Sequence, residues 1–225
     1  MNNLIVRSFA GLLFLDLVLA ACLFVPAGTL GYWQAWLFLV VWTVCIVLIT
    51  GYLVRNDPAL LERRVQAGPV AETSPVQKII QSVAALAFIL VFIVSGLDHR
   101  FQWSSVPFAV VIVAELVVAL GLYTVFLVFR ENSFTSATIE VAAEQKVVST
   151  GPYAIVRHPM YSGALLMMLF VPLALGSWVG LPFTLPLILV IILRLLDEEK
   201  LLTASLPGYA DYCQKVRYHL VPYVW

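Results

Sequence analysis

The chain has 225 residues, of which 62% are hydrophobic and only 12% are charged. Soluble domains have about 45–50% apolar and about 25% charged residues, so this composition excludes a soluble globular protein and indicates an integral membrane protein. The formal net charge is zero, and no basic run predicts binding to nucleic acid. We therefore expect the partners to be the lipid bilayer and a lipophilic small molecule, with no obligatory protein partner.

Six apolar stretches follow one another along the chain, and the last two are short. A membrane-spanning helix needs about 20 mainly apolar residues, and backbone groups in lipid must be satisfied within the segment. The sequence thus predicts an all-α integral membrane protein with about six transmembrane helices. Gly/Pro turns at 26–31 and 176–181 predict two tight hairpins. The predicted spans are 8–25, 32–53, 79–97, 106–129, 161–175 and 182–196.

The basic residues alternate between the two sides of these spans. With both termini inside, the outer connections hold only Arg100 of the 13 Lys and Arg residues. Cytoplasmic loops carry the excess of basic residues, which predicts cytoplasmic termini and cytoplasmic polar segments at 54–78 and 130–160. Two acidic residues, Asp16 and Glu115, lie inside spans, and we expect them to face the interior of the bundle.

The residues best suited to binding or catalysis lie in the segment 145–163, which reads QKVVSTGPYAIVRHPMYSG. Arg157 and His158 directly precede Pro159, which suits the first turn of a helix. The free N–H groups and the dipole of a helix N-terminus favour a carboxylate or phosphate there. No pair or cluster of the three cysteines has metal-site spacing, so we expect neither a metal nor a disulfide framework.

A second polar cluster lies at 194–200, where we expect the last span to end. Arg194 and Glu198 are four residues apart and so share a helical face, and Glu199 follows directly. The hairpin at 176–181 should return this cluster to the level of Arg157 and His158. The predicted result is one pocket at the cytoplasmic interface, lined by two cations, two carboxylates and tyrosines. Such a pocket suits a zwitterionic molecule on one side and a lipid-borne group on the other.

Three motifs carry a resemblance to a known family. They are VVSTGPYxxxRHPMYSG at 147–163, RxxxEE at 194–199 and GYxxY at 208–212. Together they resemble the isoprenylcysteine carboxyl methyltransferases and the related phospholipid methyltransferases, polytopic enzymes that use S-adenosylmethionine. The resemblance covers about the last 95 residues, and sterol reductases share a distant version of this architecture. It divides the chain into an N-terminal transmembrane region, 1–129, and a C-terminal methyltransferase region, 130–225, whose hairpin and tail form the cofactor pocket.

The resemblance also implies roles for individual residues. Arg194 matches a position that holds the substrate carboxylate, and Arg157 is the arginine of the Arg-His-Pro motif. The family places a basic tail residue near the active site, which here is Lys215 or Arg217. The end of the tail is more similar to bacterial relatives, which implies a bacterial inner membrane. The implied cofactor-binding residues are Gln145, Lys146, Val147, Val148, Tyr153, His158, Pro159, Met160, Tyr161 and Glu198.

The expected reaction is methyl transfer to a lipophilic acceptor, with an isoprenylcysteine-type carboxylate ranked first. A carboxylate is ionised at neutral pH and needs no general base, whereas an amine needs deprotonation, for which His158 and Glu199 are candidates. A phospholipid N-methyltransferase and a thiol S-methyltransferase stay open as alternatives, as do an NADPH-dependent sterol-type reductase and a small transporter. No GxGxxG follows a strand, which excludes a Rossmann methyltransferase.

Overall fold

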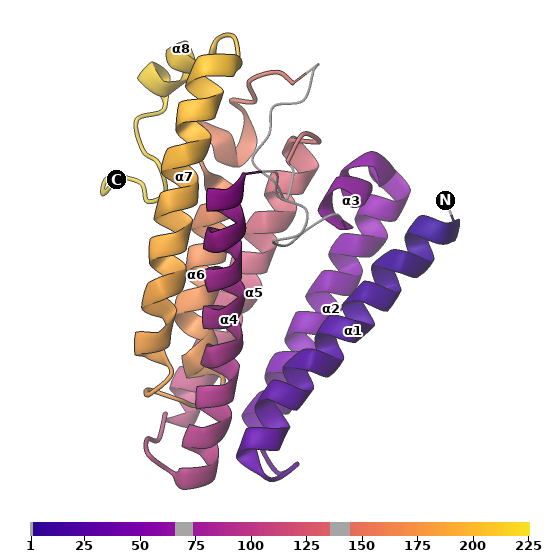
Figure 1. The fold of residues 1–225 in the computed structure, drawn as a ribbon, viewed down its shortest axis with the longest axis vertical. Coiled ribbons are helices and arrows are strands. Elements are labelled where there is room, and N and C mark those ends of the chain that lie inside the picture. Colours follow the sequence, from indigo (N-terminus) through magenta and orange to yellow (C-terminus); the bar gives the residue numbers. More distant parts are fainter. Residues whose placement is uncertain (1, 66–73, 136–144) are drawn as a thin grey trace.

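The computed structural model describes residues 2–65, 74–135 and 145–225. Within these ranges all regular structure is helical, which confirms the predicted all-α class. The helices are α1 (Asn2–Ala27), α2 (Trp33–Asn56), α3 (Pro58–Val65), α4 (Pro75–Phe101), α5 (Phe108–Glu131), the 3₁₀ helix η1 (Gly151–Ala154), α6 (Pro159–Ala174), the 3₁₀ helix η2 (Leu181–Thr184), α7 (Leu185–Ser205) and α8 (Tyr209–Lys215) (Figure 1).

Four of the described helices, α1, α2, α4 and α5, are long and apolar enough to cross a membrane. The other two predicted spans do form helices, α6 and α7, but the prediction of six full spans is not confirmed. Helix α6 has only 16 residues, which at 1.5 Å per residue cover about 24 Å of a hydrocarbon core about 30 Å thick. Helix α7 carries charged residues in its second half.

The cluster at 194–200 does not end the last apolar helix, as the sequence led us to expect. Helix α7 continues to Ser205 because its final turns have a hydrophobic partner of their own. Leu202 and Leu206 are buried against Tyr209 and Tyr212 of α8. One continuous helix therefore carries both the apolar stretch and the charged residues.

The helices divide into a compact group, α4 to α7, and a pair, α1 and α2, that lies beside it (Figure 1). Helix α6 packs most extensively on α5, and α1 contacts both α2 and α4. Two glycines allow α5 and α6 to approach closely: a Cβ added to Gly121 would lie 2.7 Å from the Gly163 carbonyl oxygen. Such small-residue contacts are typical of helix pairs in membranes.

The connections at 26–31, 102–107 and 176–181 meet at one end of the bundle. The Trp178 amide donates to Ser104 Oγ at 3.0 Å, and the Tyr32 hydroxyl donates to the Leu175 carbonyl. Helices α3 and α8 lie at the other end, and both termini lie in that half of the molecule (Figure 1). The connections thus alternate between the two ends of the bundle, as the distribution of basic residues predicted. Which end faces the cytoplasm stays a prediction.

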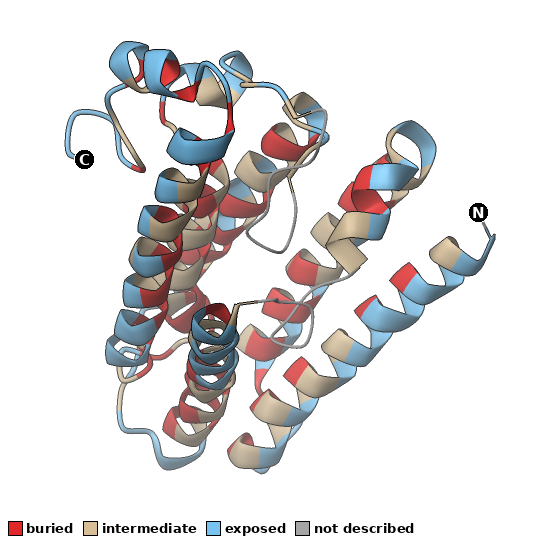
Figure 2. Cartoon of the chain, turned by 45° about the horizontal axis from the view of Figure 1, so that its top comes forward, coloured by how far each residue is buried: buried red, intermediate tan, exposed pale blue. Residues whose placement is uncertain are grey.

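The surface of the long helices is exposed and yet apolar. Leu13, Phe14 and Leu17 of α1 are 60–70% exposed, along a helix whose outer face is largely uncovered (Figure 2). Such a surface fits lipid. The carboxylate of Glu115 faces the interior as expected, with 4% of the residue exposed and no hydrogen-bond partner among the described residues. Asp16 accepts a bond from Thr43 Oγ1 at 3.1 Å, which links α1 to α2.

Candidate functional site

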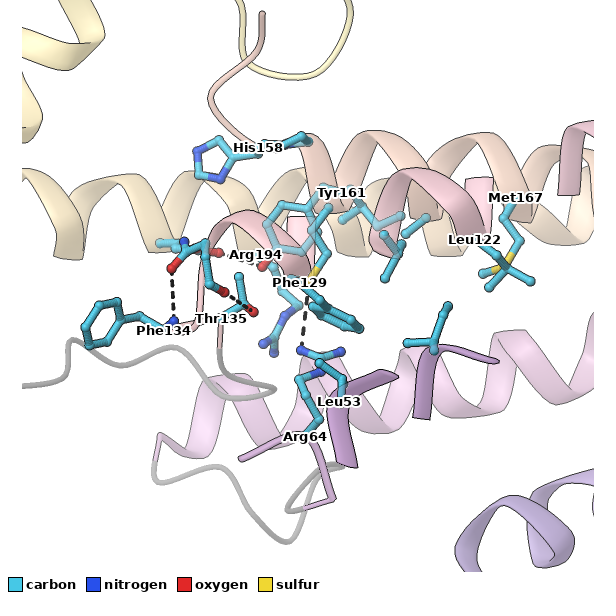
Figure 3. Close-up of a pocket in the computed structure, with 18 of the residues that line it drawn as sticks. Leu53, Arg64, Leu122, Phe129, Phe134, Thr135, His158, Tyr161, Met167 and Arg194 are labelled. Carbon is cyan, nitrogen blue, oxygen red and sulfur yellow. Dashed lines mark hydrogen bonds between the residues drawn. The ribbon is translucent and has the colours of Figure 1, made fainter. Parts of the chain in front are cut away.

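A cavity of about 810 Å³ extends from the charged end of the bundle into its apolar part. Its walls come from all the α-helices, α1 to α8, and from the segment that precedes α6. Figure 3 labels part of this lining, including Leu53, Phe129 and Tyr161. The cavity brings together all the residues predicted to bind the cofactor, along with both predicted arginines. These lining residues are Gln145, Lys146, Val147, Val148, Tyr153, Arg157, His158, Pro159, Met160, Tyr161, Arg194 and Glu198.

The start of α6 is built as the sequence predicted. Pro159 occupies the first turn, and the His158 carbonyl accepts the Ser162 amide at 3.1 Å. The C-terminal tail crosses this point. The amide of Arg157 donates to the Tyr218 carbonyl at 2.8 Å, and that of His158 donates to the His219 carbonyl at 3.0 Å. The tail therefore fixes the backbone that presents both side chains.

An ionic cluster surrounds Glu199 of α7. Its Oε1 atom lies 3.1 Å from Arg157 Nη1 and 3.2 Å from His158 Nε2, while Oε2 lies 3.0 Å from His219 Nε2. Burial alone would raise the pKa of Glu199, but the hydrogen bond from His158 and the charges of Arg157 and His219 lower it below its usual value. The carboxylate is therefore ionised at neutral pH and holds α7, α6 and the tail together.

The two adjacent carboxylates of α7 have different partners. Glu198 lines the cavity and accepts a hydrogen bond from the Tyr161 hydroxyl at 2.7 Å. Glu199 is not among the lining residues, so the expectation that both carboxylates face the pocket is wrong. Successive residues on a helix point about 100° apart, and this turn directs Glu199 toward Arg157 instead.

Arg194 is buried beside the cavity and is held by the start of α4. Its Nη1 atom donates to Gln77 Oε1 at 3.0 Å, and Gln77 Nε2 donates to Asp197 Oδ2 at 2.8 Å. Arg194 is only 8% exposed and Gln77 only 5%. A residue of the N-terminal half thus positions the arginine that the family resemblance assigns to the substrate.

Tyr153 is fixed from both sides. Its hydroxyl accepts a bond from Asn132 Nδ2 at 3.0 Å, and its carbonyl accepts one from the Tyr212 hydroxyl at 2.8 Å. Burial raises the pKa of the Tyr153 phenol above its ordinary value. This residue therefore stays neutral and acts as a wall and hydrogen-bonding group, without a role as a base.

The tail reaches the site through a residue that sequence reasoning missed. Neither Lys215 nor Arg217 lines the cavity, and both are exposed; the Arg217 carbonyl accepts a bond from Arg157 Nη2 at 3.3 Å. Their predicted contact with substrate stays a prediction. The basic tail residue that joins the cluster around Glu199 is His219. Its position in the basic tail was the feature of the sequence that could have indicated this role. Gln77 and Arg64 had no motif to reveal them.

The residues present fit S-adenosylmethionine, which carries an ammonium, a carboxylate and a sulfonium group. The Glu198 carboxylate faces the cavity and suits the ammonium. The first-turn N–H groups of α6 suit a carboxylate. Val147, Val148 and Tyr153 offer apolar and aromatic surface for the adenosyl group.

The four apolar helices indicate an integral membrane protein, and the mixed cavity is its candidate site. Residues 109–207 match the family model described as phospholipid methyltransferase, a range that begins in α5 and ends after α7. The match confirms the resemblance to this family and indicates a membrane methyltransferase. No curated protein matches the chain.

Proposed function

We propose that this protein is an S-adenosylmethionine-dependent methyltransferase of the membrane, acting on a lipophilic acceptor whose preferred group is an isoprenylcysteine-type carboxylate. One observation carries the proposal. A single cavity is lined at one end by the implied cofactor residues and at the other by apolar side chains of the N-terminal helices, including Leu12, Trp42 and Phe88. A polar donor and a lipid-like acceptor can meet in such a cavity.

The chain's own residues would act mainly by positioning. The cofactor supplies a methyl group already activated on its sulfonium, so holding donor and acceptor in line contributes most, on the order of 7–11 kcal/mol. Glu198, oriented by Tyr161, would fix the ammonium end. Arg194, oriented by Gln77, would hold the acceptor carboxylate, for which the planar guanidinium is well matched.

The cavity also fits an acceptor that enters from the bilayer while the cofactor enters from the cytoplasm. The charged residues lie at the end of the bundle with the polar segments, and the apolar lining lies deeper between the spans. This arrangement supports an active site that faces the cytoplasm. Hydrophobic burial of a prenyl or acyl chain would contribute about 0.8 kcal/mol per methylene group.

A second candidate is an amine or thiol acceptor, as in a phospholipid N-methyltransferase or a thiol S-methyltransferase. It is favoured by the contacts that connect His158, which lines the cavity, through Glu199 to His219. A protic acceptor must lose a proton, and His158 is placed to accept it. A carboxylate acceptor has no proton to lose, so the contacts from His158 through Glu199 to His219 would then have no role in catalysis.

The test is calorimetric titration of the detergent-purified protein with S-adenosylmethionine and S-adenosylhomocysteine. We expect binding by the wild-type protein and weaker binding by Glu198→Gln and His158→Ala. Asp211→Asn is the matched control, since this carboxylate is exposed on α8 away from the cavity. Absence of binding by folded wild-type protein would contradict the proposal, and binding of NADPH instead would favour the reductase.

A further inference from the structure

Helices α1 and α4 meet at one end of the bundle and separate toward the other. Their contact is tight at Gly96, where an added Cβ would lie 2.6 Å from the Leu23 carbonyl oxygen and 3.2 Å from Pro26 Cβ. Toward the end that carries α3 and α8, the two helices diverge (Figure 1, Figure 2). The cavity borders the separated parts, because residues from 8–15 of α1 and from 81–88 of α4 contribute to its lining. These helices therefore form neighbouring walls of the cavity that touch at one end and stand apart at the other.

The exposed lining residues show where the cavity opens. Of the described residues that line it, four are exposed: Arg7, Gly11, Ala85 and Lys146. Arg7 precedes the predicted span 8–25, and Lys146 lies in the polar segment before α6, so both mark the charged end. Gly11 and Ala85 instead lie within the apolar helices α1 and α4. A residue that lines a cavity and is also exposed belongs to its rim, so the cavity has a second opening between α1 and α4.

The second opening lies below the polar end of the bundle. Gly11 is three residues inside the predicted span 8–25, and Ala85 is six residues inside 79–97. At 1.5 Å per residue these positions are about 5 Å and about 9 Å from the start of each span. The rim is also small, because a Cβ added to Gly11 would meet no heavy atom within 4 Å apart from its chain neighbours and the backbone of its own helix. The opening therefore faces the hydrocarbon of the bilayer, where an apolar chain is stable and a polar group is not.

The volume of the cavity gives such an opening a use. Pockets of about 300–1,000 Å³ hold one drug-sized ligand, whereas this cavity of about 810 Å³ has to hold S-adenosylmethionine and the reacting end of the acceptor. Its lining on α7 extends from Arg194 to Leu187, a depth of about 10 Å. An extended hydrocarbon chain advances roughly 1.3 Å per bond of about 1.5 Å, so roughly eight carbons span this depth. A longer chain has to leave the cavity.

We propose that the apolar chain of the acceptor passes between α1 and α4, with Gly11 and Ala85 at the edges of the opening, and extends into the bilayer. The inference rests on the proposed function and deepens it, because it assigns the acceptor to lipids whose chain is longer than the cavity. Both edges lie outside the matched residues 109–207, so the path of the chain is a property of the N-terminal helices. The protein then accepts long chains that a closed cavity would reject.

The experiment places an aromatic ring at each edge of the opening, with the full chain in phosphatidylcholine nanodiscs. Gly11→Phe and Ala85→Phe are compared with the matched controls Ala10→Phe and Val83→Phe, because Ala10 and Val83 are exposed on the same helices and do not line the cavity. The probes are thioacetic acids and cysteamines that carry an S-prenyl, S-geranyl, S-farnesyl or S-geranylgeranyl chain, so that carboxylate and amine acceptors are both represented. Calorimetric affinities are compared between variant and wild type for each probe, so that partition of the probe into the bilayer cancels.

The wild-type protein should bind at least one series, and within it the geranylgeranyl probe as well as the farnesyl probe. Gly11→Phe and Ala85→Phe should weaken both about tenfold, since displacing roughly two methylene groups from the opening already has this effect. The prenyl and geranyl probes, which the cavity can contain, should bind as they do to the wild type. Ala10→Phe and Val83→Phe should leave every affinity unchanged. The dependence on chain length is the readout because a folding defect would weaken short and long probes alike.

S-adenosylhomocysteine binding by the same preparations separates this inference from the proposed function. If Gly11→Phe and Ala85→Phe bind it as the wild type does but bind the long probes more weakly, the inference holds. Rejection of the geranylgeranyl probe by the wild type would overturn it in favour of a closed cavity. Edge variants that bind the long probes normally, or that weaken short and long probes equally, would overturn it too, as would a wild type that binds neither series. If the chain-length pattern is found but S-adenosylhomocysteine is not bound, the methyltransferase is contradicted and the opening stands.

Discussion

Glu199 Oε2 lies 3.0 Å from Nε2 of His219, so a carboxylate of α7 holds the C-terminal tail against the start of α6. The backbone bonds from Arg157 and His158 to the same stretch of tail reinforce this contact. The tail lies beyond the matched residues 109–207. The geometry of the Arg-His-Pro motif therefore depends on a part of the chain that the family match does not cover.

Glu199→Gln should destabilise the protein more than a typical surface substitution. The carboxylate has three partners, Arg157, His158 and His219, and is largely buried. Its neutral replacement leaves a buried guanidinium without its counter-charge, which costs about 1–3 kcal/mol. Thermal unfolding in detergent measures the loss, with Asp211→Asn as control. Equal unfolding temperatures for the two variants would show that the cluster contributes nothing to stability.

Stability should fall as the pH falls below neutral, and His219 should account for the first part of the fall. Burial lowers the pKa of His219, an effect that the nearby Glu199 only partly offsets. The unfolded chain therefore binds the proton at higher pH than the folded chain, and stability decreases once the pH drops below about 6.5.

Glu199 acts in the same direction at lower pH. Its pKa is lowered in the folded protein, so its contribution is present above the ordinary value of about 4.3 and is lost as the pH falls through the folded value. Unfolding temperatures recorded from pH 8 to pH 5 should decline less in His219→Gln, whose amide can still donate to Glu199. A variant profile parallel to that of the wild type would assign the decline to other groups.

Tyr161→Phe should weaken cofactor binding with little loss of stability. The hydroxyl donates to Glu198 Oε2 at 2.7 Å and so orients the carboxylate proposed to receive the cofactor's ammonium. Loss of one hydrogen bond to a charged group costs about 1.5–3 kcal/mol, or roughly a tenfold or greater rise in Kd. Titration with S-adenosylhomocysteine measures it. Tyr218→Phe is the control, and an equal affinity in both variants would remove Glu198 from the proposed role.

The helices were largely predictable because hydrophobic length determines where a span lies. The predicted stretch 106–129 corresponds to α5, Phe108–Glu131. The continuation of α7 through its charged residues was not predictable from composition. It depends on burial of Leu202 and Leu206 by the aromatic residues of α8, a contact that forms only after the chain turns back.

The site was predictable where its residues are close in sequence or share a helix. The Arg-His-Pro motif indicated the start of α6, and the family resemblance indicated Glu198. Which of the two carboxylates faces the cavity was not predictable, because it depends on the rotation of α7 relative to α6: Glu198 lines the cavity and Glu199 binds Arg157. Arg64 meets Met160 from 96 residues away in sequence, so only the fold reveals it.

Gly121→Ala should force α5 and α6 apart. An added Cβ would lie 2.7 Å from the Gly163 carbonyl oxygen and 3.1 Å from the Met167 amide nitrogen, and backbone atoms cannot move aside as a flexible side chain can. Overpacking of this kind costs about 1–3 kcal/mol. Because Gly163 lies only two residues after Tyr161, the displacement should also weaken S-adenosylhomocysteine binding.

The matched control for this contact is Gly51→Ala in α2. A Cβ at Gly51 would have no heavy atom within 4 Å apart from its chain neighbours and the backbone of its own helix, and alanine is favoured over glycine in a helix by about 1 kcal/mol. Gly51→Ala should therefore be as stable as the wild type or slightly more stable, with unchanged affinity for S-adenosylhomocysteine. If Gly121→Ala unfolds at the same temperature as Gly51→Ala and binds S-adenosylhomocysteine equally well, the close approach of α5 and α6 contributes neither to stability nor to the site.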